Sequence, residues 1–165
     1  METTIYQTMR YLRKSKHSKI IKEGWKYSLT NARQNRKIRN ELLNEQVEFD
    51  SYFCAYTERR VLYEKSCDVE HFDERKKGED DDDYWNWYAV LHDINRGKPS
   101  IRNFEPIADP YDENLPERIH YVDGEFYAVD QNDQEAKNLI DFLGWNSLEL
   151  VKDRNSLGSV DICRG

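Results

Sequence analysis

Residues 67–100 place two short structured segments on either side of an acidic loop, and this stretch constrains the fold more than any other. Residues 67–69 have the composition of a strand that leads into the pair Glu70–His71. Residues 78–83 include four consecutive aspartates and are a loop by composition. Residues 85–96 carry apolar side chains at helical spacing, followed by a glycine and a proline. The stretch therefore predicts a short helix laid against a strand.

Glu70, His71, Asn86 and Asn95 are the polar residues of this stretch whose chemistry suits phosphodiester hydrolysis. A neutral imidazole can take a proton from water near pH 7, because its unperturbed pKa is about 6.5. Carboxylate and amide oxygens suit a hard cation such as Mg²⁺. Each residue alone is more often structural, as a satisfied histidine or a helix-capping asparagine. Their joint occurrence in this order indicates a hydrolytic site.

Val-Glu-His-Phe at residues 69–72, followed by Asn86 and by Asn-Arg-Gly-Lys at residues 95–98, resembles the motif of the HNH nucleases, which have a ββα-metal core. Residues 86–98 are also similar to the HNH domain of the RNA-guided CRISPR nucleases. The resemblance implies that His71 is the general base, with its ring oriented by Asn86. It also implies that Glu70 and Asn95 bind a divalent metal, for which Mg²⁺ is expected and Mn²⁺ is an alternative.

His92 lies three residues before Asn95 and so shares a helix face with it. It is either an auxiliary ligand or phosphate contact, or a residue at the surface or behind the ligands, and we favour the second reading. Arg96 and Lys98, close by in the sequence, are candidate nucleic-acid contacts.

The charge is unevenly distributed along the chain. The net charge is −7, yet residues 1–40 hold eleven Lys or Arg and two Glu, which leaves the remainder strongly acidic. A basic arm before an acidic body suggests polyanion binding, with Arg10, Arg13 and Lys14 as candidate contacts. Aromatic residues are interleaved with these charges, namely Tyr6, Tyr11, Trp25 and Tyr27. They either stack on bases or pack on the body of the protein, and both readings stay open.

The remaining segments predict an α+β fold. We expect a helix at 31–46, capped by Thr30, with a buried stripe of Ile38, Leu42 and Val47, and then a strand and turn at 52–63. A hairpin is expected at 119–129, with its turn at Asp123–Gly124, and a helix at 132–143 that ends at Gly144. A last helix is expected through Arg154, with Asn146 and Glu149 as capping box, followed by a loose tail. The expected parts are a basic helical arm (1–48), a ββα-metal HNH core (49–103), and an extension (104–165) with a hairpin and two helices.

Metal binding outside the proposed site is not expected. HNH proteins often carry a structural zinc held by two Cys-x-x-Cys pairs, but here only Cys54 matches, and apolar Leu91 and Ile94 occupy the places of the second pair. A closed zinc site needs four ligands, so we predict none. The aspartate run 80–83 is expected to stay solvated. The three unpaired cysteines predict a reducing, cytoplasmic setting, and the chain has no apolar run that predicts a membrane span.

Residues 109–114, 119–121, 139–146 and 150–154 are similar to the extension of HNH proteins from Septu and retron anti-phage systems, the PtuB type. The whole resemblance spans residues 53–154. It implies a metal-dependent endonuclease of bacterial defence that works with a partner ATPase of the ABC/SMC-like class (PtuA type). DNA is the favoured substrate, and RNA, including tRNA, remains open.

Two other functions stay open. The chain could be a catalytically weak HNH-fold subunit that binds nucleic acid or a partner. Alternatively, it could bind nucleic acid through its basic arm alone, in which case binding would depend on salt and not on divalent metal.

Overall fold

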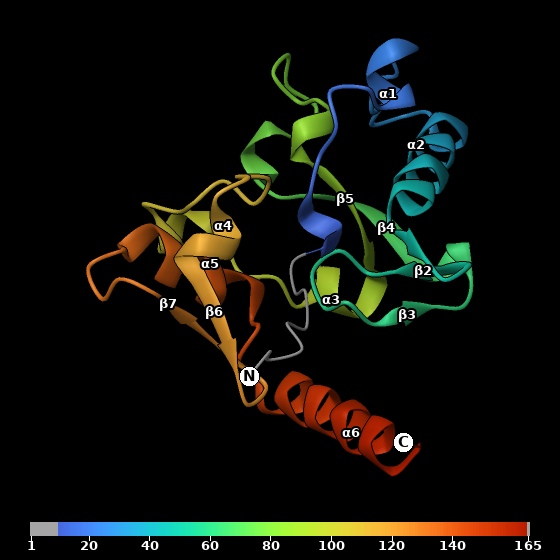
Figure 1. Cartoon of the computed structure of the whole chain (residues 1–165). Coiled ribbons are helices and arrows are strands. Elements are labelled where there is room, and N and C mark those ends of the chain that lie inside the picture. Colours follow the sequence, from blue (N-terminus) through green and yellow to red (C-terminus); the bar gives the residue numbers. More distant parts are fainter. Residues whose placement is uncertain (1–9, 165) are drawn as a thin grey trace. The chain divides into compact units, whose positions relative to one another are not determined.

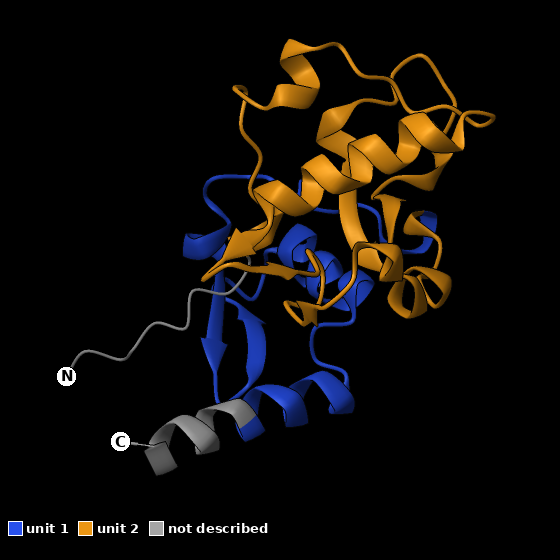
Figure 2. Cartoon of the chain, turned by 90° about the vertical axis from the view of Figure 1, so that its right-hand side faces the viewer, with its two compact units in different colours: residues 1–8, 102–165 blue, residues 9–101 orange. Residues whose placement is uncertain are grey.

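The computed structural model describes residues 10–164, with side chains through Ser156. Helices and small antiparallel sheets make an α+β protein, as the sequence predicts (Figure 1). The chain divides into two compact units, residues 9–101 and a C-terminal unit that begins at Arg102 (Figure 2). The described part of the basic arm thus belongs to the same unit as the segment that carries the candidate site.

The first unit contains the following elements in chain order: η1 (Arg10–Leu12), α1 (Lys19–Lys22), α2 (Ala32–Glu45), β1 (Val47–Glu48), β2 (Ser51–Phe53), β3 (Arg60–Val61), η2 (Glu64–Ser66), β4 (Cys67–His71), η3 (Glu74–Lys76), η4 (Tyr84–Asn86), β5 (Trp87–Leu91) and α3 (His92–Arg96). Strands β1, β2 and β3 form one sheet, and β4 and β5 form another. The predicted strand and turn at 52–63 correspond to β2 and β3, which pair with Tyr52 opposite Val61.

The β4–β5 hairpin is the centre of the first unit. Its antiparallel register runs from Cys67 opposite Leu91 to His71 opposite Trp87. Helix α2 packs against both strands and buries Ile38, Leu42 and Leu43. This arrangement places the end of β4 beside the start of β5.

Gln46, at the end of α2, binds the β5 backbone through its side-chain amide. Its Nε2 donates to the carbonyl of Ala89 at 2.9 Å, and its Oε1 accepts from the Ala89 amide at 3.0 Å. The same Nε2 donates to the Phe53 carbonyl at 2.8 Å. Gln46 therefore connects α2 to both sheets with a side chain that is fully satisfied.

The helix predicted at 85–96 is wrong for most of its length. Residues 87–91 form strand β5, and the helix begins only at His92. The residues from Trp87 to Val90 are all fully buried, so the segment has no exposed face of the kind an amphipathic helix shows. A continuous aromatic and β-branched run of this length suits a buried strand, and its spacing happens to match helical periodicity as well.

The predicted helix at 31–46 is confirmed as α2, but two of its details are wrong. Its N-cap is Asn31 and not Thr30, because the Asn31 side chain accepts a hydrogen bond from the Gln34 amide at 3.1 Å. Val47 lies beyond the helix in β1 and is exposed, so the buried stripe ends with Leu42 and Leu43.

The short helix η5 (Ile101–Phe104) spans the boundary between the units. The second unit then contains α4 (Leu115–Arg118), β6 (Ile119–Val122), β7 (Glu125–Ala128), α5 (Gln134–Leu143) and α6 (Leu148–Arg164). The predicted hairpin is confirmed, and its turn residues Asp123 and Gly124 both have positive φ. Helix α5 buries the predicted stripe Ala136, Leu139, Ile140 and Leu143 and ends at Gly144 in the left-handed conformation.

Two predictions for the last helix are wrong. Asn146 is not a capping residue, because its side chain binds both backbone groups of Phe126, at 2.7 and 2.9 Å. Helix α6 also continues to Arg164, past the expected end at Arg154 and through most of the segment expected to be loose. No helix in the described part of the chain is long and apolar enough to cross a membrane.

Candidate active site at the β4–β5 hairpin

The residues predicted to form a site are carried by three consecutive elements of the first unit. Glu70 and His71 end β4, Asn86 immediately precedes β5, and Asn95 lies on α3. Because β4 and β5 are antiparallel, Asn86 returns to the end of β4, where its carbonyl accepts the Phe72 amide hydrogen bond at 2.9 Å. Helix α3 follows β5 directly and brings Asn95 back to β4. Strand, strand and helix thus occur in the order ββα.

Glu70 forms a buried ion pair with Lys98. Lys98 Nζ lies 2.7 Å from Glu70 Oε1 and also donates to the backbone carbonyls of His71 and Phe72, at 2.6 and 3.1 Å. The Glu70 and Lys98 side chains are only 3% and 9% exposed. Burial raises the pKa of the Glu70 carboxyl, and the attraction of Lys98 opposes that rise. Lys98, predicted as a nucleic-acid contact, therefore directs its charge inward.

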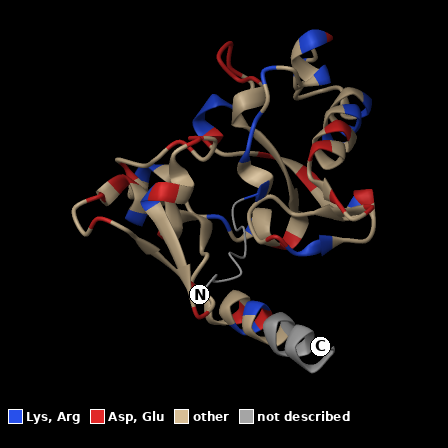
Figure 3. Ribbon diagram, in the orientation of Figure 1, with Lys and Arg blue, Asp and Glu red and all other residues tan. Residues whose placement is uncertain are grey.

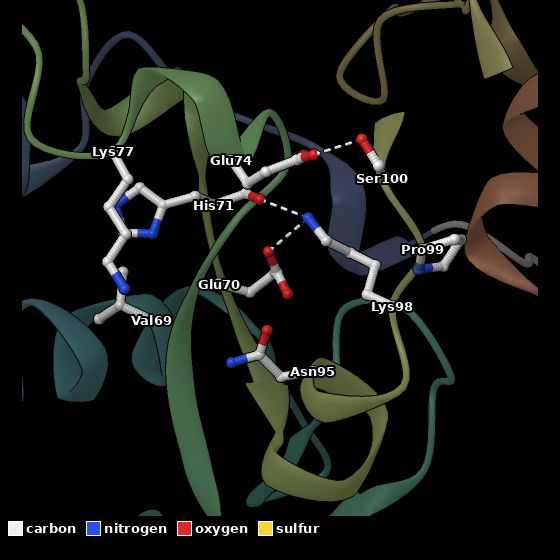
Figure 4. A pocket seen from close by; sticks show the side chains of 9 residues that line it. All are labelled: Val69, Glu70, His71, Glu74, Lys77, Asn95, Lys98, Pro99 and Ser100. Atoms are coloured by element: carbon white, nitrogen blue, oxygen red, sulfur yellow. Dashed lines mark hydrogen bonds and ion pairs between the residues drawn. The ribbon is translucent and has the colours of Figure 1, made fainter. Parts of the chain in front are cut away.

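The second carboxylate oxygen of Glu70, Oε2, is buried and has no hydrogen-bond partner among the described residues. Glu70 also lines a cavity of about 330 Å³, together with Val69, His71, Glu74, Lys77, Asn95, Lys98, Pro99 and Ser100. Figure 4 shows the Asn95 amide oxygen directed toward the Glu70 carboxylate. Two such oxygen atoms come close together when a cation lies between them or when a proton is shared, and burial favours the protonated form of Glu70.

Asp68 fixes this orientation of Asn95. The Asn95 Nδ2 donates to Asp68 Oδ2 at 3.0 Å, which leaves its oxygen directed to the other side. Glu70 Oε2 and Asn95 Oδ1 therefore fit a hard divalent cation that completes its coordination with water. In the described residues, no group of three or more His, Cys, Asp or Glu side chains is arranged to bind a metal. A cation at this position would therefore have few protein ligands and would take the remainder from water.

His92 is bound at both ring nitrogens. Its Nδ1 lies 2.7 Å from Asp68 Oδ1, and its Nε2 lies 2.6 Å from the carbonyl oxygen of Lys65. The hydrogen bond to Asp68 raises the pKa of His92 above its ordinary value. His92 thus holds Asp68, which in turn holds Asn95, and this places it behind the cavity, as we favoured.

His71 is buried and binds Asp82. Its Nε2 lies 3.0 Å from Asp82 Oδ2, while Asp82 Oδ1 accepts from Trp87 Nε1 at 2.8 Å and Asn86 Nδ2 at 3.1 Å. Burial alone would raise the pKa of Asp82, but the hydrogen bonds from His71, Asn86 and Trp87 outweigh it and lower the pKa. Asp82 is therefore a carboxylate, and it accepts a hydrogen bond from His71 Nε2.

Tyr27 packs against the other side of the His71 ring. The two rings meet edge to face, with centroids 4.5 Å apart. In Figure 4 the His71 ring extends toward Lys77, away from the Glu70 carboxylate, although both residues line the same cavity. The imidazole is thus placed beside the candidate metal position and is not one of its ligands.

Two sequence-based expectations about this network are wrong. Asn86 does not bind the His71 ring; it binds both backbone groups of Asp73 and the side chain of Asp82, and so acts on His71 through Asp82. Asp82 was expected in a solvated loop but is buried and 6% exposed. Nothing in a run of four aspartates distinguishes Asp82 from its neighbours, and the only available signal was that a buried histidine needs a partner for its second nitrogen.

Two of the basic residues of the arm, Arg10 and Lys14, bind to other parts of the first unit. Arg10 lies 2.5 Å from Glu48, and Lys14 binds the Trp87 carbonyl between the rings of Tyr84 and Tyr88. Burial lowers the pKa of Lys14 to about 7. Of the other candidate contacts, Arg13 and Arg96 are exposed.

The aromatic residues of the arm pack inward where they are described. Tyr11 stacks on Phe53 with ring centroids 5.0 Å apart, Tyr27 covers His71, and Trp25 lies under the ammonium of Lys37. Tyr6 lies outside the described residues. Of the two readings left open, packing on the body is found for Tyr11 and Tyr27, whereas Trp25 contacts lysines of the arm itself.

Comparison with known proteins returns no relative: no protein family matches this chain, and neither a curated protein nor a solved structure is similar to it.

Proposed function

We propose that this chain is a metal-dependent endonuclease of the HNH type that hydrolyses phosphodiester bonds of nucleic acid. One observation carries the proposal: Glu70, on the first strand of a ββα unit, has a buried carboxylate oxygen without a hydrogen-bond partner among the described residues and lines the same cavity as Asn95 of the helix. A ββα-metal core is what the resemblance to HNH nucleases implies. The metal, Mg²⁺ or Mn²⁺, would be held by Glu70 and Asn95.

The bound cation would supply charge stabilisation at the phosphate and at the leaving oxygen. Asp82, as a carboxylate, keeps the proton on His71 Nε2, so the other nitrogen, Nδ1, carries the lone pair. That nitrogen is the general base that takes the proton of the attacking water. Tyr27 and Trp87, whose rings flank the imidazole, hold its plane.

The site described here would contact a phosphate and not a base, so it sets no preference between DNA and RNA; we favour DNA and keep RNA, including tRNA, as substrates to be tested. We further propose that the protein is an effector of bacterial anti-phage defence and acts with a partner ATPase of the ABC/SMC-like class. The support for both is the resemblance of residues 53–154 to PtuB-type proteins.

The direct test is cleavage of plasmid DNA, single-stranded DNA and tRNA by the purified chain, alone and with the ATPase, in Mg²⁺ or Mn²⁺. We expect cleavage that EDTA abolishes and that His71→Ala lacks. His17→Ala is the matched control, because His17 is exposed. Cleavage by His71→Ala at the wild-type rate, or no cleavage by the wild type under any of these conditions, would refute the proposal.

One observation favours a second function, that of a catalytically weak subunit that keeps the fold. Lys98 forms an ion pair with Glu70 at 2.7 Å, and a carboxylate that a lysine neutralises has less need of a cation. In that case Mg²⁺ would leave the thermal unfolding temperature unchanged, whereas a binding metal raises it by mass action.

A further inference from the structure

A second cavity, of about 390 Å³, lies beside the candidate site. Its lining residues are Tyr27, Ala32, Asn35, Arg36, Arg39, Cys67, Asp68, Val69, Lys77 and Asn95. Three of these, Val69, Lys77 and Asn95, also line the cavity of Glu70 and His71. The two cavities are therefore adjacent, and the second one, which lies along α2, is called the groove below.

One face of α2 forms a side of this groove. Ala32, Asn35, Arg36 and Arg39 follow the spacing of a helical stripe, and the buried residues Ile38 and Leu42 lie on the adjoining side of the helix. Ala32 is small and leaves the groove open at the helix start. Figure 3 shows the basic residues along α2 as blue segments.

The groove is cationic. It is lined by Arg36, Arg39 and Lys77, none of which has an ion-pair partner in the described part of the chain. Arg39 donates through Nε and Nη2 to the neutral amide of Asn40, at 3.1 Å each, so its charge is fixed in place but not neutralised. Lys77 lies 5.7 Å from the centroid of the Tyr27 ring.

The single carboxylate of the groove does not cancel these charges. Asp68 is already bound by His92 and Asn95, and its charge is directed to them. Cations that a protein leaves unpaired in a concave surface attract a polyanion, and guanidinium groups bind phosphate oxygens in bidentate fashion.

We propose that Arg36, Arg39 and Lys77 form a phosphate-binding subsite that holds a nucleic-acid strand next to the cavity of Glu70 and His71. The inference deepens the proposed function, on which its meaning for catalysis rests. Binding through this groove is independent of base sequence, because only phosphates are contacted. Lys77 and Asn95 lie in both cavities and connect the subsite to the reacting position.

The test measures binding without metal, so that it does not depend on catalysis. The full chain is titrated into fluorescein-labelled 20-nucleotide DNA, single-stranded and duplex, in EDTA, and anisotropy is followed from low to physiological salt. The groove variant is Arg36→Gln with Arg39→Gln. The control is Arg33→Gln with Lys22→Gln, which removes the same charge from exposed positions that do not line the groove.

We expect the groove variant to bind both probes more weakly and to lower the slope of log K against log salt by about two, roughly one per lost phosphate contact, while the control lowers it less. Lys77→Gln should lower the slope by about one and does not alter a helix. Thermal unfolding of every variant identifies any that fails to fold. Equal losses in the groove and control variants, or no binding by the wild type, would overturn the subsite.

Cleavage in Mg²⁺ separates this proposal from the endonuclease. If the wild type binds DNA through the groove but does not cut it, the subsite is supported and the endonuclease proposal is contradicted. If the wild type cuts, and the groove variant binds and cuts equally well, the subsite is contradicted and the endonuclease proposal is supported.

Discussion

His71 Nε2 and Asp82 Oδ2 lie 3.0 Å apart, and both side chains are almost fully buried. The pair joins the end of β4 to a loop that composition alone marks as solvated. Asp82 also accepts from Asn86 and Trp87, so three donors converge on one carboxylate. The tautomer of His71 is thus set by a residue eleven positions further along the chain.

Asp82→Asn should reduce cleavage by about 10²- to 10⁴-fold, the range that general-base catalysis contributes. The amide can donate to Nε2, which would move the proton to Nδ1 and remove the lone pair from the catalytic position. Asp83→Asn is the matched control, because Asp83 is exposed. Equal rates for the two variants would show that Asp82 does not set the tautomer.

Asp82 should also make stability depend on acid. The pKa of Asp82 is lowered in the folded state, so its stabilising contribution is present above its ordinary value of about 3.9 and is lost as the pH falls through the lowered pKa. The free energy of unfolding of the wild type, measured with urea, should therefore fall as the pH is lowered through this window. The free energy of unfolding of Asp82→Asn should depend less on pH in the same window.

Lys98→Met should destabilise the protein by about 3–5 kcal/mol at pH 7, because it leaves the Glu70 carboxylate buried without its cation. The pKa of Glu70 is raised by burial, so its contribution to stability is present below about pH 4.3 and is lost as the pH rises through the folded pKa. The free energy of unfolding of Lys98→Met, measured with urea, should therefore increase as the pH is lowered toward 5. Lys16→Met, at an exposed position, should change little.

His92 should titrate above its ordinary pKa, since the hydrogen bond to Asp68 favours its protonated form. An NMR titration of the His92 ring measures this, and Asp68→Asn should return the pKa toward about 6.5. The same variant should weaken Mg²⁺ binding, because it releases Asn95. An unchanged His92 titration in Asp68→Asn would exclude the link from His92 to Asn95.

Lys14 should lose its proton near neutral pH, because burial lowers its pKa to about 7 from 10.5. Between these two values the unfolded chain binds a proton that the folded chain lacks, so stability should rise with pH across this window. Reductive methylation with ¹³C and an NMR titration would give the pKa directly, and exposed Lys16 provides the comparison. A Lys14 signal that titrates with that of Lys16 would refute the prediction.

The elements with one clear period and clear end signals could be predicted from sequence. The stripe of Ala136, Leu139, Ile140 and Leu143, ended by Gly144, gives α5. The alternation around Asp123–Gly124 gives the hairpin β6–β7. In both cases the residues that decide the element lie within it.

The elements that depend on distant partners could not be predicted in this way. Residues 87–91 become a strand because β4 and Gln46 provide hydrogen-bond partners for their backbone. Lys98 was expected to face nucleic acid, and only the return of the chain past β4 brings its ammonium to Glu70. Order and spacing found the residues of the candidate site, whereas their pairing is set by tertiary contacts.

Gln46 has a consequence for the accuracy of the groove. Helix α2 carries Arg36 and Arg39, and β5 leads into the helix of Asn95, so the amide of Gln46 joins the two sides on which substrate would rest. A slide or rotation of α2 by even one residue would break both bonds to Ala89. If the groove binds nucleic acid as proposed, Gln46 would help to fix the distance between the bound phosphate and the cavity of Glu70.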